Sequence, residues 1–219
     1  MLACSWSGGK DSALALHELI RSKEHEVATL LTTVTEEYDR VTMHGVRSEL
    51  IRQQALSIGI PLVEVRISEN ISEKEYEERM QNVMSRFKEA GIESVAFGDL
   101  FLEDVRRRRE ANLARIGMKA VFPLWGRNTR KLGLEFVRLG FKAITTCVDT
   151  DLLKGDFVGR DVDENFLNDL PAQADPCGEN GEFHSFVYDG PIFQKAISFK
   201  KGDVVVKRGQ FHYCDLLPQ

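Results

Sequence analysis

Six consecutive residues near the beginning of the chain have the chemistry of a phosphate-binding loop. Glycines let the backbone come close to phosphate oxygens, serine hydroxyls donate hydrogen bonds, and a lysine supplies a mobile positive charge. A helix that follows such a loop adds free N–H groups and the positive end of its dipole. The residues are Ser7, Gly8, Gly9, Lys10, Asp11 and Ser12.

The spacing of this loop differs from the pattern G-x-x-x-x-G-K-[ST]. Gly8 and Gly9 are adjacent, and Asp11 separates Lys10 from Ser12. A carboxylate beside a phosphate is explained if Mg²⁺ bridges the two, since Mg²⁺ binds one or two carboxylates together with phosphate oxygens. We therefore expect a phosphate ligand on the loop and Mg²⁺ at Asp11. The alternative is a Ser/Gly turn that only caps a helix.

A second concentration of titratable residues lies in the Gly-rich stretch GENGEFH. Glu179, Glu182 and His184 follow one another closely there. Because alternate side chains of a strand share a face, Glu182 and His184 are expected side by side. We interpret the three residues as part of a substrate site. The alternative is an Asn-Gly hairpin that exposes its carboxylates.

A run of four arginines is expected to open a helix just after a buried strand. On a helix Arg106 and Arg109 share a face, and Glu110 lies beside them. We expect these three residues to contact substrate above the strand end. Arg107 and Arg108 are assigned instead to a solvated face with ion pairs.

Three more residues are candidates for the same site. His44 lies in the loop after the second expected strand, Asp99 directly follows the strand SVAFG, and Arg160 lies in the polar loop FVGRDVD. His44 would contact substrate, Asp99 substrate or a metal, and Arg160 an anion. The alternatives are surface residues and, for Asp99, a helix cap.

Short apolar runs alternate with helical patterns over the first 125 or so residues. Such alternation predicts βαβ units and a doubly wound, Rossmann-like parallel sheet of about five strands in an α/β fold. Ligands of such sheets bind at the carboxyl ends of the strands, where the loop SGGKDS is expected. The expected strands are 2–6, 27–34, 61–67, 94–98 and 119–125, and the expected helices are 11–23, 46–58, 72–90 and 103–116.

The pattern changes beyond Trp125. A helix at 129–139 and a strand at 143–148 precede a polar stretch and a β-rich tail, in which KKGD and KRGQ are expected to form hairpin turns. We predict two domains, residues 1–126 for nucleotide binding and residues 127–219 as a smaller α+β domain.

Composition narrows the classes of function. The net charge of −5, from 29 basic and 34 acidic residues, argues against broad nucleic-acid binding, which needs a basic surface. No apolar run suits a membrane-spanning helix, and no export signal precedes the first strand. The four cysteines form no C-x-x-C pair, so we expect reduced thiols in a cytoplasmic protein.

The loop SGGKDS after a first strand resembles the pyrophosphate loop of the N-type ATP pyrophosphatases, which are adenine nucleotide alpha-hydrolase-like. Three further stretches resemble the diphthine–ammonia ligase family: GDLFLEDVRRRRE, PLW and GENGEFHSFVYDGP. The resemblance implies an ATP- and Mg²⁺-dependent ligase. It would cleave ATP to AMP and pyrophosphate, activate a carboxylate as an acyl-adenylate, and convert it with ammonia to an amide.

The resemblance also implies roles for individual residues. The loop Ser7–Ser12 would bind ATP, and the catalytic residues would be Lys10, Asp11, Glu182 and His184. The remaining candidates would bind the acceptor, a small-molecule or protein-borne carboxylate, or ammonia: His44, Asp99, Arg106, Arg109, Glu110, Arg160 and Glu179.

The motif GENGEFH departs from the diphthamide-making branch, which reads E-G-G-E-x-E. Asn180 and His184 stand at the two changed positions. The motif resembles that of a second, largely bacterial branch, for which a part in corrinoid salvage has been proposed, and the acceptor stays open. Two other functions stay open too: a nucleotide-binding regulatory module without turnover, and an ATP-dependent thiolating enzyme that would use Cys177. A homo-oligomer is also left open.

Overall fold

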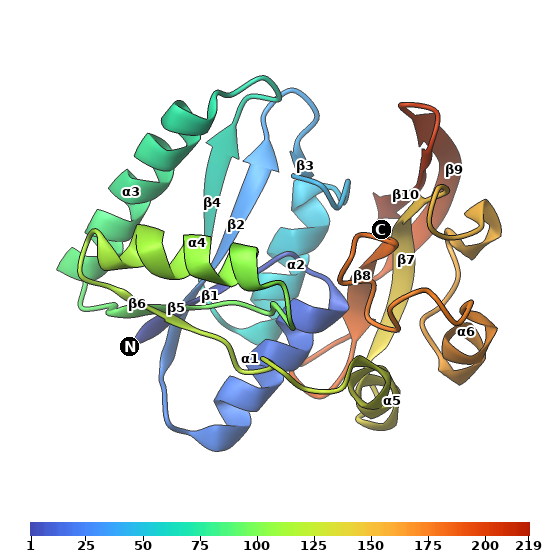
Figure 1. Cartoon of the computed structure of the whole chain (residues 1–219), viewed down its shortest axis with the longest axis horizontal. Coiled ribbons are helices and arrows are strands. Elements are labelled where there is room, and N and C mark those ends of the chain that lie inside the picture. Colours follow the sequence, from blue (N-terminus) through green and yellow to red (C-terminus); the bar gives the residue numbers. More distant parts are fainter.

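The computed structural model describes all of residues 1–219, which form two β-sheets with their helices (Figure 1). We call the first sheet A and the second sheet B. Sheet A contains β1 (Leu2–Ser5), β2 (Val27–Thr35), β3 (Arg40–Val41), β4 (Leu62–Ile67), β5 (Ser94–Ala96) and β6 (Lys119–Val121).

Sheet A has the topology that the alternating pattern predicts. Its parallel strands lie in the order β4-β2-β1-β5-β6, and only the short β3 pairs antiparallel, with the end of β2. The direction of winding reverses between β1 and β5, which makes the carboxyl ends of these two strands the expected ligand site. The prediction of an α/β, doubly wound parallel sheet is confirmed.

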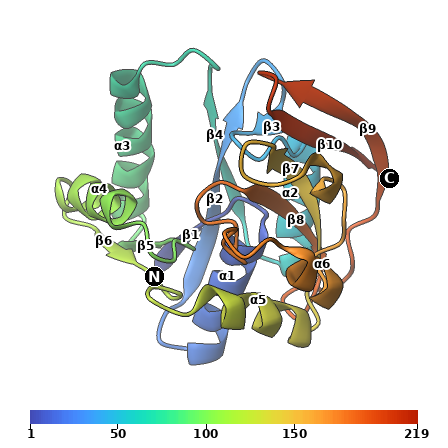
Figure 2. The same cartoon turned by 45° about the vertical axis from the view of Figure 1, so that its right-hand side comes forward.

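Two pairs of helices cover the two faces of sheet A (Figures 1 and 2). One face carries α1 (Lys10–Ser22) and α2 (Ser48–Ile58), and the other carries α3 (Glu73–Glu89) and α4 (Glu103–Ala114). The helix α3 begins at a capping box, in which the Ser72 and Glu75 side chains each bond the other residue's backbone N–H. None of the helices is both long enough and apolar enough to cross a membrane.

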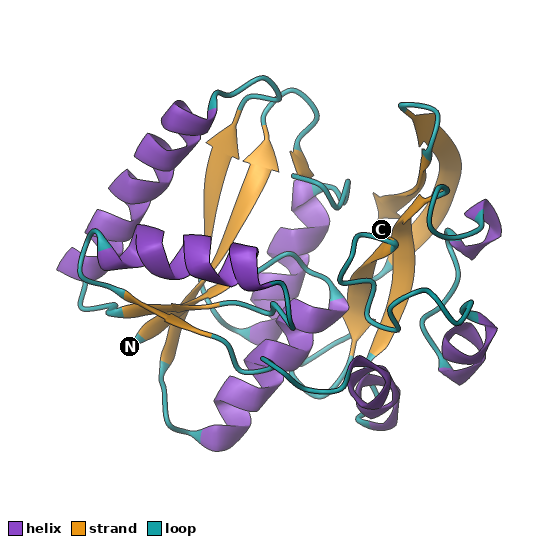
Figure 3. Cartoon of the chain, viewed as in Figure 1, coloured by secondary structure: helices purple, strands orange, loops and turns teal.

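Sheet B is antiparallel and lies beside α1 and α2 (Figure 3). The strands of sheet B lie in the order β8-β7-β10-β9. They are β7 (Lys142–Asp149), β8 (Phe183–Asp189), β9 (Phe199–Lys207) and β10 (Phe211–Pro218), and the accompanying helices are α5 (Thr129–Arg138), η1 (Gly155–Phe157) and α6 (Glu164–Asp169). The helices α6 and η1 lie on the side of sheet B that faces away from sheet A (Figure 1).

One of the two expected hairpin turns is wrong. The segment KKGD, residues 200–203, continues as part of the single strand β9, because the long β10 offers partners to the chain on both sides of it. The irregularity is a β-bulge in β9, where Gly202 and Asp203 together lie opposite the single residue Asp215 of β10. The turn at KRGQ is confirmed, since the chain reverses there between β9 and β10.

The two sheets share one hydrophobic core. A single cluster of 35 buried residues runs from Leu16 and Leu50 on α1 and α2 to Phe183 and Phe186 on β8. A smaller cluster of 11 residues lies between sheet A and the helices α3 and α4. All four cysteines are buried and free, as expected for reduced thiols.

An ion-pair clamp also joins the sheets. Asp215 of β10 accepts from Arg47 at 2.7 Å and from Arg40 at 2.8 Å, and both arginines flank the loop between β3 and α2. Burial alone would raise the pKa of Asp215, but the hydrogen bonds and charges of the two arginines outweigh it and hold the pKa at about 2.

We predict that Asp215→Asn lowers the free energy of unfolding by about 1–2 kcal/mol at neutral pH. The pKa is depressed in the folded state, so the contribution is complete above about pH 4, where an unfolded aspartate ionises, and is lost as the pH falls towards about 2. Urea unfolding over a pH series measures it. Asp156→Asn, at an exposed position of η1 without a side-chain partner, is the control. A difference that stays constant down to about pH 3 would contradict the clamp.

Candidate functional site

The SGGKDS loop occupies the carboxyl end of β1, and α1 begins inside it at Lys10. Gly8 has a φ of +77°, and a side chain there would collide with Ile51 and Gln54. A side chain at Gly9 would lie 2.9 Å from the Ser185 carbonyl oxygen of β8. Both glycines are therefore needed for the loop to fit between α2 and β8.

Gln54 holds the back of the loop. Its side chain is fully buried, its Oε1 accepts from Trp6 Nε1 at 2.8 Å, and its Nε2 donates to the Gly8 carbonyl at 3.0 Å and to the Val187 carbonyl. The N–H of Val187 donates to the same Gly8 carbonyl at 2.9 Å. One amide thus ties β1, the loop and β8 together. Gln54 was not among the residues expected from the sequence, although a glutamine among the apolar residues of helix 46–58 was a usable signal.

Lys10 lies inside the protein, only 4% exposed. Its Nζ donates to the carboxylate of Asp11 at 2.8 Å and to the carbonyl of Cys177, and it lies 5.0 Å from the centre of the Phe183 ring. Burial would lower the pKa of Lys10, but the charge of Asp11, the hydrogen bond to it and the neighbouring Cys177 and Glu179 together outweigh burial, and the pKa is raised. The lysine therefore stays charged while it joins the loop to sheet B.

Carboxylates outnumber cations around Lys10. Burial raises the pKa of Asp11 against the opposing effect of Lys10, and Asp175 adds to the rise. Burial also raises the pKa of Glu179 to about 7, although its Oε1 accepts from the Leu100 N–H at 2.8 Å. Both carboxyl groups therefore lose their proton less readily than exposed carboxyl groups do.

These residues fit a magnesium ion that arrives with phosphate. No three side chains among His, Cys, Asp and Glu converge into a ready-made metal site. Mg²⁺ needs only one or two carboxylates when phosphate oxygens and water complete its shell. Asp11, whose side chain is 28% exposed, has an accessible carboxylate beside the loop.

His44 and His184 form a close pair across the gap between the two sheets. Their ring centres are 4.4 Å apart, and the buried Nδ1 of His44 has no hydrogen-bond partner. Burial lowers the pKa of His184 to about 4, aided by the charge of Lys10. Burial, His184 and Lys10 together lower the pKa of His44 well below its usual value. Both imidazoles are therefore neutral at pH 7 and able to accept a proton.

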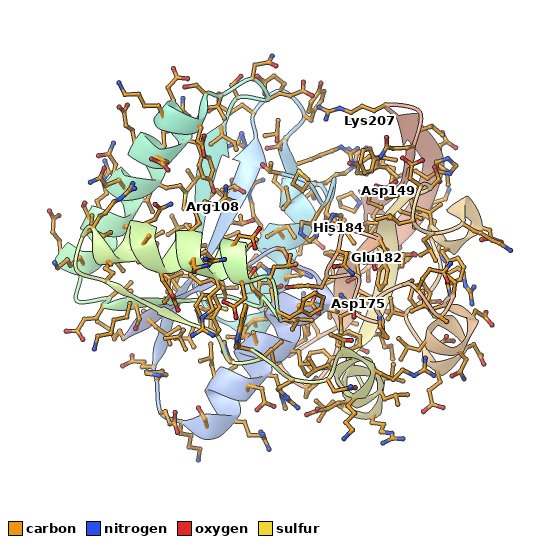
Figure 4. The ribbon with its side chains drawn as sticks, in the orientation of Figure 1. Arg108, Asp149, Asp175, Glu182, His184 and Lys207 are labelled. Atoms are coloured by element: carbon orange, nitrogen blue, oxygen red, sulfur yellow. The ribbon has the colours of Figure 1, made fainter.

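Glu182 lies next to this pair but is turned into its own loop (Figure 4). Its carboxylate is buried and accepts from the N–H of Asp175 at 2.7 Å and from the N–H and Nδ2 of Asn180 at 3.1 Å. These contacts are those of a residue that shapes the turn 175–182.

Asp99 and Arg109 form an ion pair at the end of β5, with 2.7 Å between Nε and Oδ2. The Arg109 guanidinium lies 4.2 Å from the centre of the Phe97 ring. Gly98 lets this region approach the phosphate loop, because a side chain there would lie 2.9 Å from the carbonyl carbon of Asp11.

The remaining expected residues lie elsewhere. Arg106 pairs with Glu110 at 2.8 Å, and its guanidinium lies 4.6 Å from the centre of the Trp125 ring. Arg160 pairs with Asp169 at the end of α6, on the side of sheet B away from sheet A. The structure does not bring these three side chains, Arg106, Glu110 and Arg160, to Lys10.

A cavity of about 730 Å³ opens beside the loop, between the ends of β1 and β2 and the helices α3 and α4. Ser7, Arg109 and the segment 31–33 line it together with apolar side chains of α3. Arg108, expected on a solvated face, is exposed but also lines this cavity, as Figure 4 shows. The size is that of a pocket for a small organic molecule.

Comparison with known proteins divides the chain into two segments, one that contains sheet A and one that contains sheet B. Residues 1–120 match the family model of the diphthamide synthase N-terminal domain, and residues 128–214 match that of the diphthamide synthase C-terminal domain. The chain belongs to the diphthamide synthase family.

Relatives within this family include curated proteins named diphthine–ammonia ligase. The protein from Schizosaccharomyces pombe is 28% identical over 218 residues, which cover 91% of this chain but only 36% of that longer relative. The proteins from Danio rerio and Homo sapiens are each 26% identical over 91% of this chain, which spans 86% and 83% of their lengths.

In this member of the diphthamide synthase family we predict that Gln54→Leu loosens the loop. The variant keeps the volume but leaves the Trp6 N–H and the Val187 carbonyl unpaired in the interior, so the free energy of unfolding should fall by about 2–4 kcal/mol. Urea unfolding measures the loss, and hydrogen exchange at the Val187 amide reports the loop contact. The control is Gln53→Leu on the same helix. Unchanged protection at Val187 would contradict the assignment.

Proposed function

We propose that this chain is an ATP-dependent adenylating amide ligase, which cleaves ATP to AMP and pyrophosphate to activate a carboxylate for ammonia. The observation that carries the proposal is the position of the SGGKDS loop, between a cavity of nucleoside size and a cluster of carboxylates and histidines. The name diphthine–ammonia ligase, borne by relatives that match most of the chain, supports it.

The phosphates of ATP would lie at the start of α1. Its N–H groups, the hydroxyls of Ser7 and Ser12, which are 3.2 Å apart, and the charge of Lys10 would bind the departing pyrophosphate. Lys10 would exchange its contacts with Asp11 and Cys177 for phosphate oxygens. Mg²⁺ held by Asp11 would neutralise charge on the phosphates. The adenosine would occupy the cavity between β2, α3 and α4.

The acceptor would enter from the side of sheet B. Attack of its carboxylate oxygen on the α-phosphorus would expel pyrophosphate and form an acyl-adenylate. Ammonia would then attack the acyl carbon, AMP would leave, and one proton would be released. The neutral pair His44–His184 is too weak a base for ammonium, but it would take the proton from the far more acidic nitrogen that forms when ammonia has attacked the acyl carbon. Glu182 would contribute by shaping the turn that carries Glu179.

The identity of the acceptor is proposed only as a carboxylic acid, borne by a small molecule or by a protein. The glutamate of the diphthamide-making motif is His184 here, so diphthine is one candidate among several. Four buried, free thiols suit the reducing cytoplasm as the place of reaction.

The structure favours the ligase over a thiolating enzyme. A sulfur nucleophile needs a lowered thiol pKa and access to solvent. Cys177 is buried, its Sγ donates to the Thr129 carbonyl, and burial raises the pKa of its thiol.

The proposed reaction predicts equal amounts of AMP and pyrophosphate in continued turnover, which needs MgATP, ammonium and the acceptor together. Lys10→Ala removes the cation that would face the pyrophosphate, so the affinity for MgATP should fall roughly ten- to a hundredfold. Calorimetry measures binding, and product analysis with a panel of carboxylic acids measures turnover. Lys74→Ala, on exposed α3, is the control. Nucleotide binding without AMP for any acid would favour a regulatory module.

We also predict that His184→Asn leaves the affinity for MgATP nearly unchanged but slows amide formation roughly a hundredfold, because the amide cannot accept a proton at neutral pH. His184→Glu should abolish the native reaction without conferring amidation of diphthine. Calorimetry and amide analysis separate the two steps, and His25→Asn is the exposed control. A wild-type chain that amidates diphthine efficiently would place it in the diphthamide-making branch.

A further inference from the structure

The strand β9 is an edge of sheet B with nothing paired to its outer side. It pairs with β10 alone and lies at the periphery of the molecule in two views (Figures 1 and 2). Val204, Val205 and Val206 near its end are 51%, 48% and 52% exposed. A row of free backbone groups with three adjacent exposed valines is a template for another strand.

The opposite edge of the same sheet is occupied within the chain. The N–H of Val187 on β8 donates to the Gly8 carbonyl, and the Val187 carbonyl accepts from Gln54. Sheet B therefore has one open edge, β9.

Self-pairing of β9 has to satisfy a geometric rule. When two identical strands pair antiparallel about a two-fold axis perpendicular to the sheet, residues that face each other must point to the same side. The axis therefore passes between the two copies of one residue. A residue that lies a given number of positions before it in one copy faces the residue that lies the same number of positions after it in the other copy.

One such register matches the charges of β9. With the axis at Val205, Asp203 faces Lys207 of the second copy, Lys207 faces its Asp203, and Val204 faces Val206. Opposite charges directly across two strands stabilise the pair.

The neighbouring registers lack this match. An axis at Val204 places Lys201 opposite Lys207, and an axis at Asp203 places two aspartates opposite each other. An axis at Val206 leaves Asp203 opposite a glycine. Charge complementarity thus selects the register that also buries all three valines against one another.

We propose that β9 is a dimerisation edge, at which a second copy of this chain pairs antiparallel about Val205. The two four-stranded sheets then become one continuous eight-stranded sheet. The contact is short, so the dimer is a weak and reversible one.

Both charged residues are exposed, although Lys207 already packs against two tyrosine rings, those of Tyr38 and Tyr213. Asp203 is the second residue of the β-bulge in β9, and the alternation that runs from it through Val204 to Lys207 places it on the same face as Lys207. The Nζ of Lys207 lies 4.5 Å from the centre of the Tyr38 ring, at the end of β9 nearest sheet A, as Figure 4 shows.

Sedimentation velocity of the full chain over a micromolar concentration series tests the proposal. The wild type should show a monomer–dimer equilibrium. Asp203→Lys places lysine opposite lysine, and Lys207→Glu places glutamate opposite aspartate. Each substitution should weaken the dimer roughly tenfold or more. The double variant D203K/K207E restores opposite charges and should dimerise like the wild type.

An equimolar mixture of the two single variants, Asp203→Lys and Lys207→Glu, provides the most specific test. Each variant alone repels itself. In a mixed pair, the lysine introduced at position 203 of one chain faces the glutamate introduced at position 207 of the other. The native Lys207 of the first chain then faces the native Asp203 of the second, so the mixture should form heterodimers. Lys74→Glu on α3 is the control and should not change association.

Three outcomes would overturn the proposal. A wild type that stays monomeric throughout the series would leave β9 to a different partner. Association that ignores both single substitutions, or a mixture that fails to associate, would place the dimer contact elsewhere. Circular dichroism and MgATP binding of the variants should match the wild type, since both positions lie outside the proposed active site.

Discussion

The hydrogen bond from the Val187 N–H to the Gly8 carbonyl is the contact on which the arrangement of the site depends. A loop that binds an anion must turn its N–H groups towards the ligand and find partners for its carbonyls elsewhere. The strand β8 and Gln54 supply those partners for the Gly8 carbonyl. The Ser185 Oγ also accepts from the Lys10 N–H at 3.1 Å, so this N–H is held by β8 and not directed at a ligand. The SGGKDS loop is therefore held in place by the second sheet, and the segments that match the two family domains meet across a shared core.

This junction also sets the electrostatics. Because the loop and β8 pack closely, Lys10 is almost fully buried and Asp11 and Glu179 are largely enclosed, and burial is the largest single influence on the pKa of each. The raised pKa values of Asp11 and Glu179 show that the site resists further negative charge. The proposed ATP would therefore bind more readily with Mg²⁺ to neutralise its phosphates.

The sequence predicted what local patterns encode. Alternating apolar runs and helical periodicity indicated the parallel sheet, and the composition of residues 7–12 identified the loop at its switch point. The hairpin expected at KKGD failed because the distant β10 offers longer pairing than a local turn. Gln54 and Val187 are 133 residues apart, so no local sequence pattern predicts their contact. Arg106 and Arg109 lie close together on α4, but their guanidinium groups contact different rings. Arg106 lies over Trp125, beyond β6, and Arg109 lies over Phe97, at the end of β5, which local sequence does not reveal.

The histidine at position 184 has a consequence that extends to its neighbour. Two neutral imidazoles 4.4 Å apart form a proton-accepting pair. A glutamate at the same position, as in the motif of the diphthamide-making branch, would be a buried anion beside His44 and would raise the pKa of that imidazole. The pair would then be an ion pair with a proton to donate rather than to accept. One substitution would therefore change the charge of two residues at the proposed acceptor site, so we propose that position 184 influences which substrate is used as well as the rate.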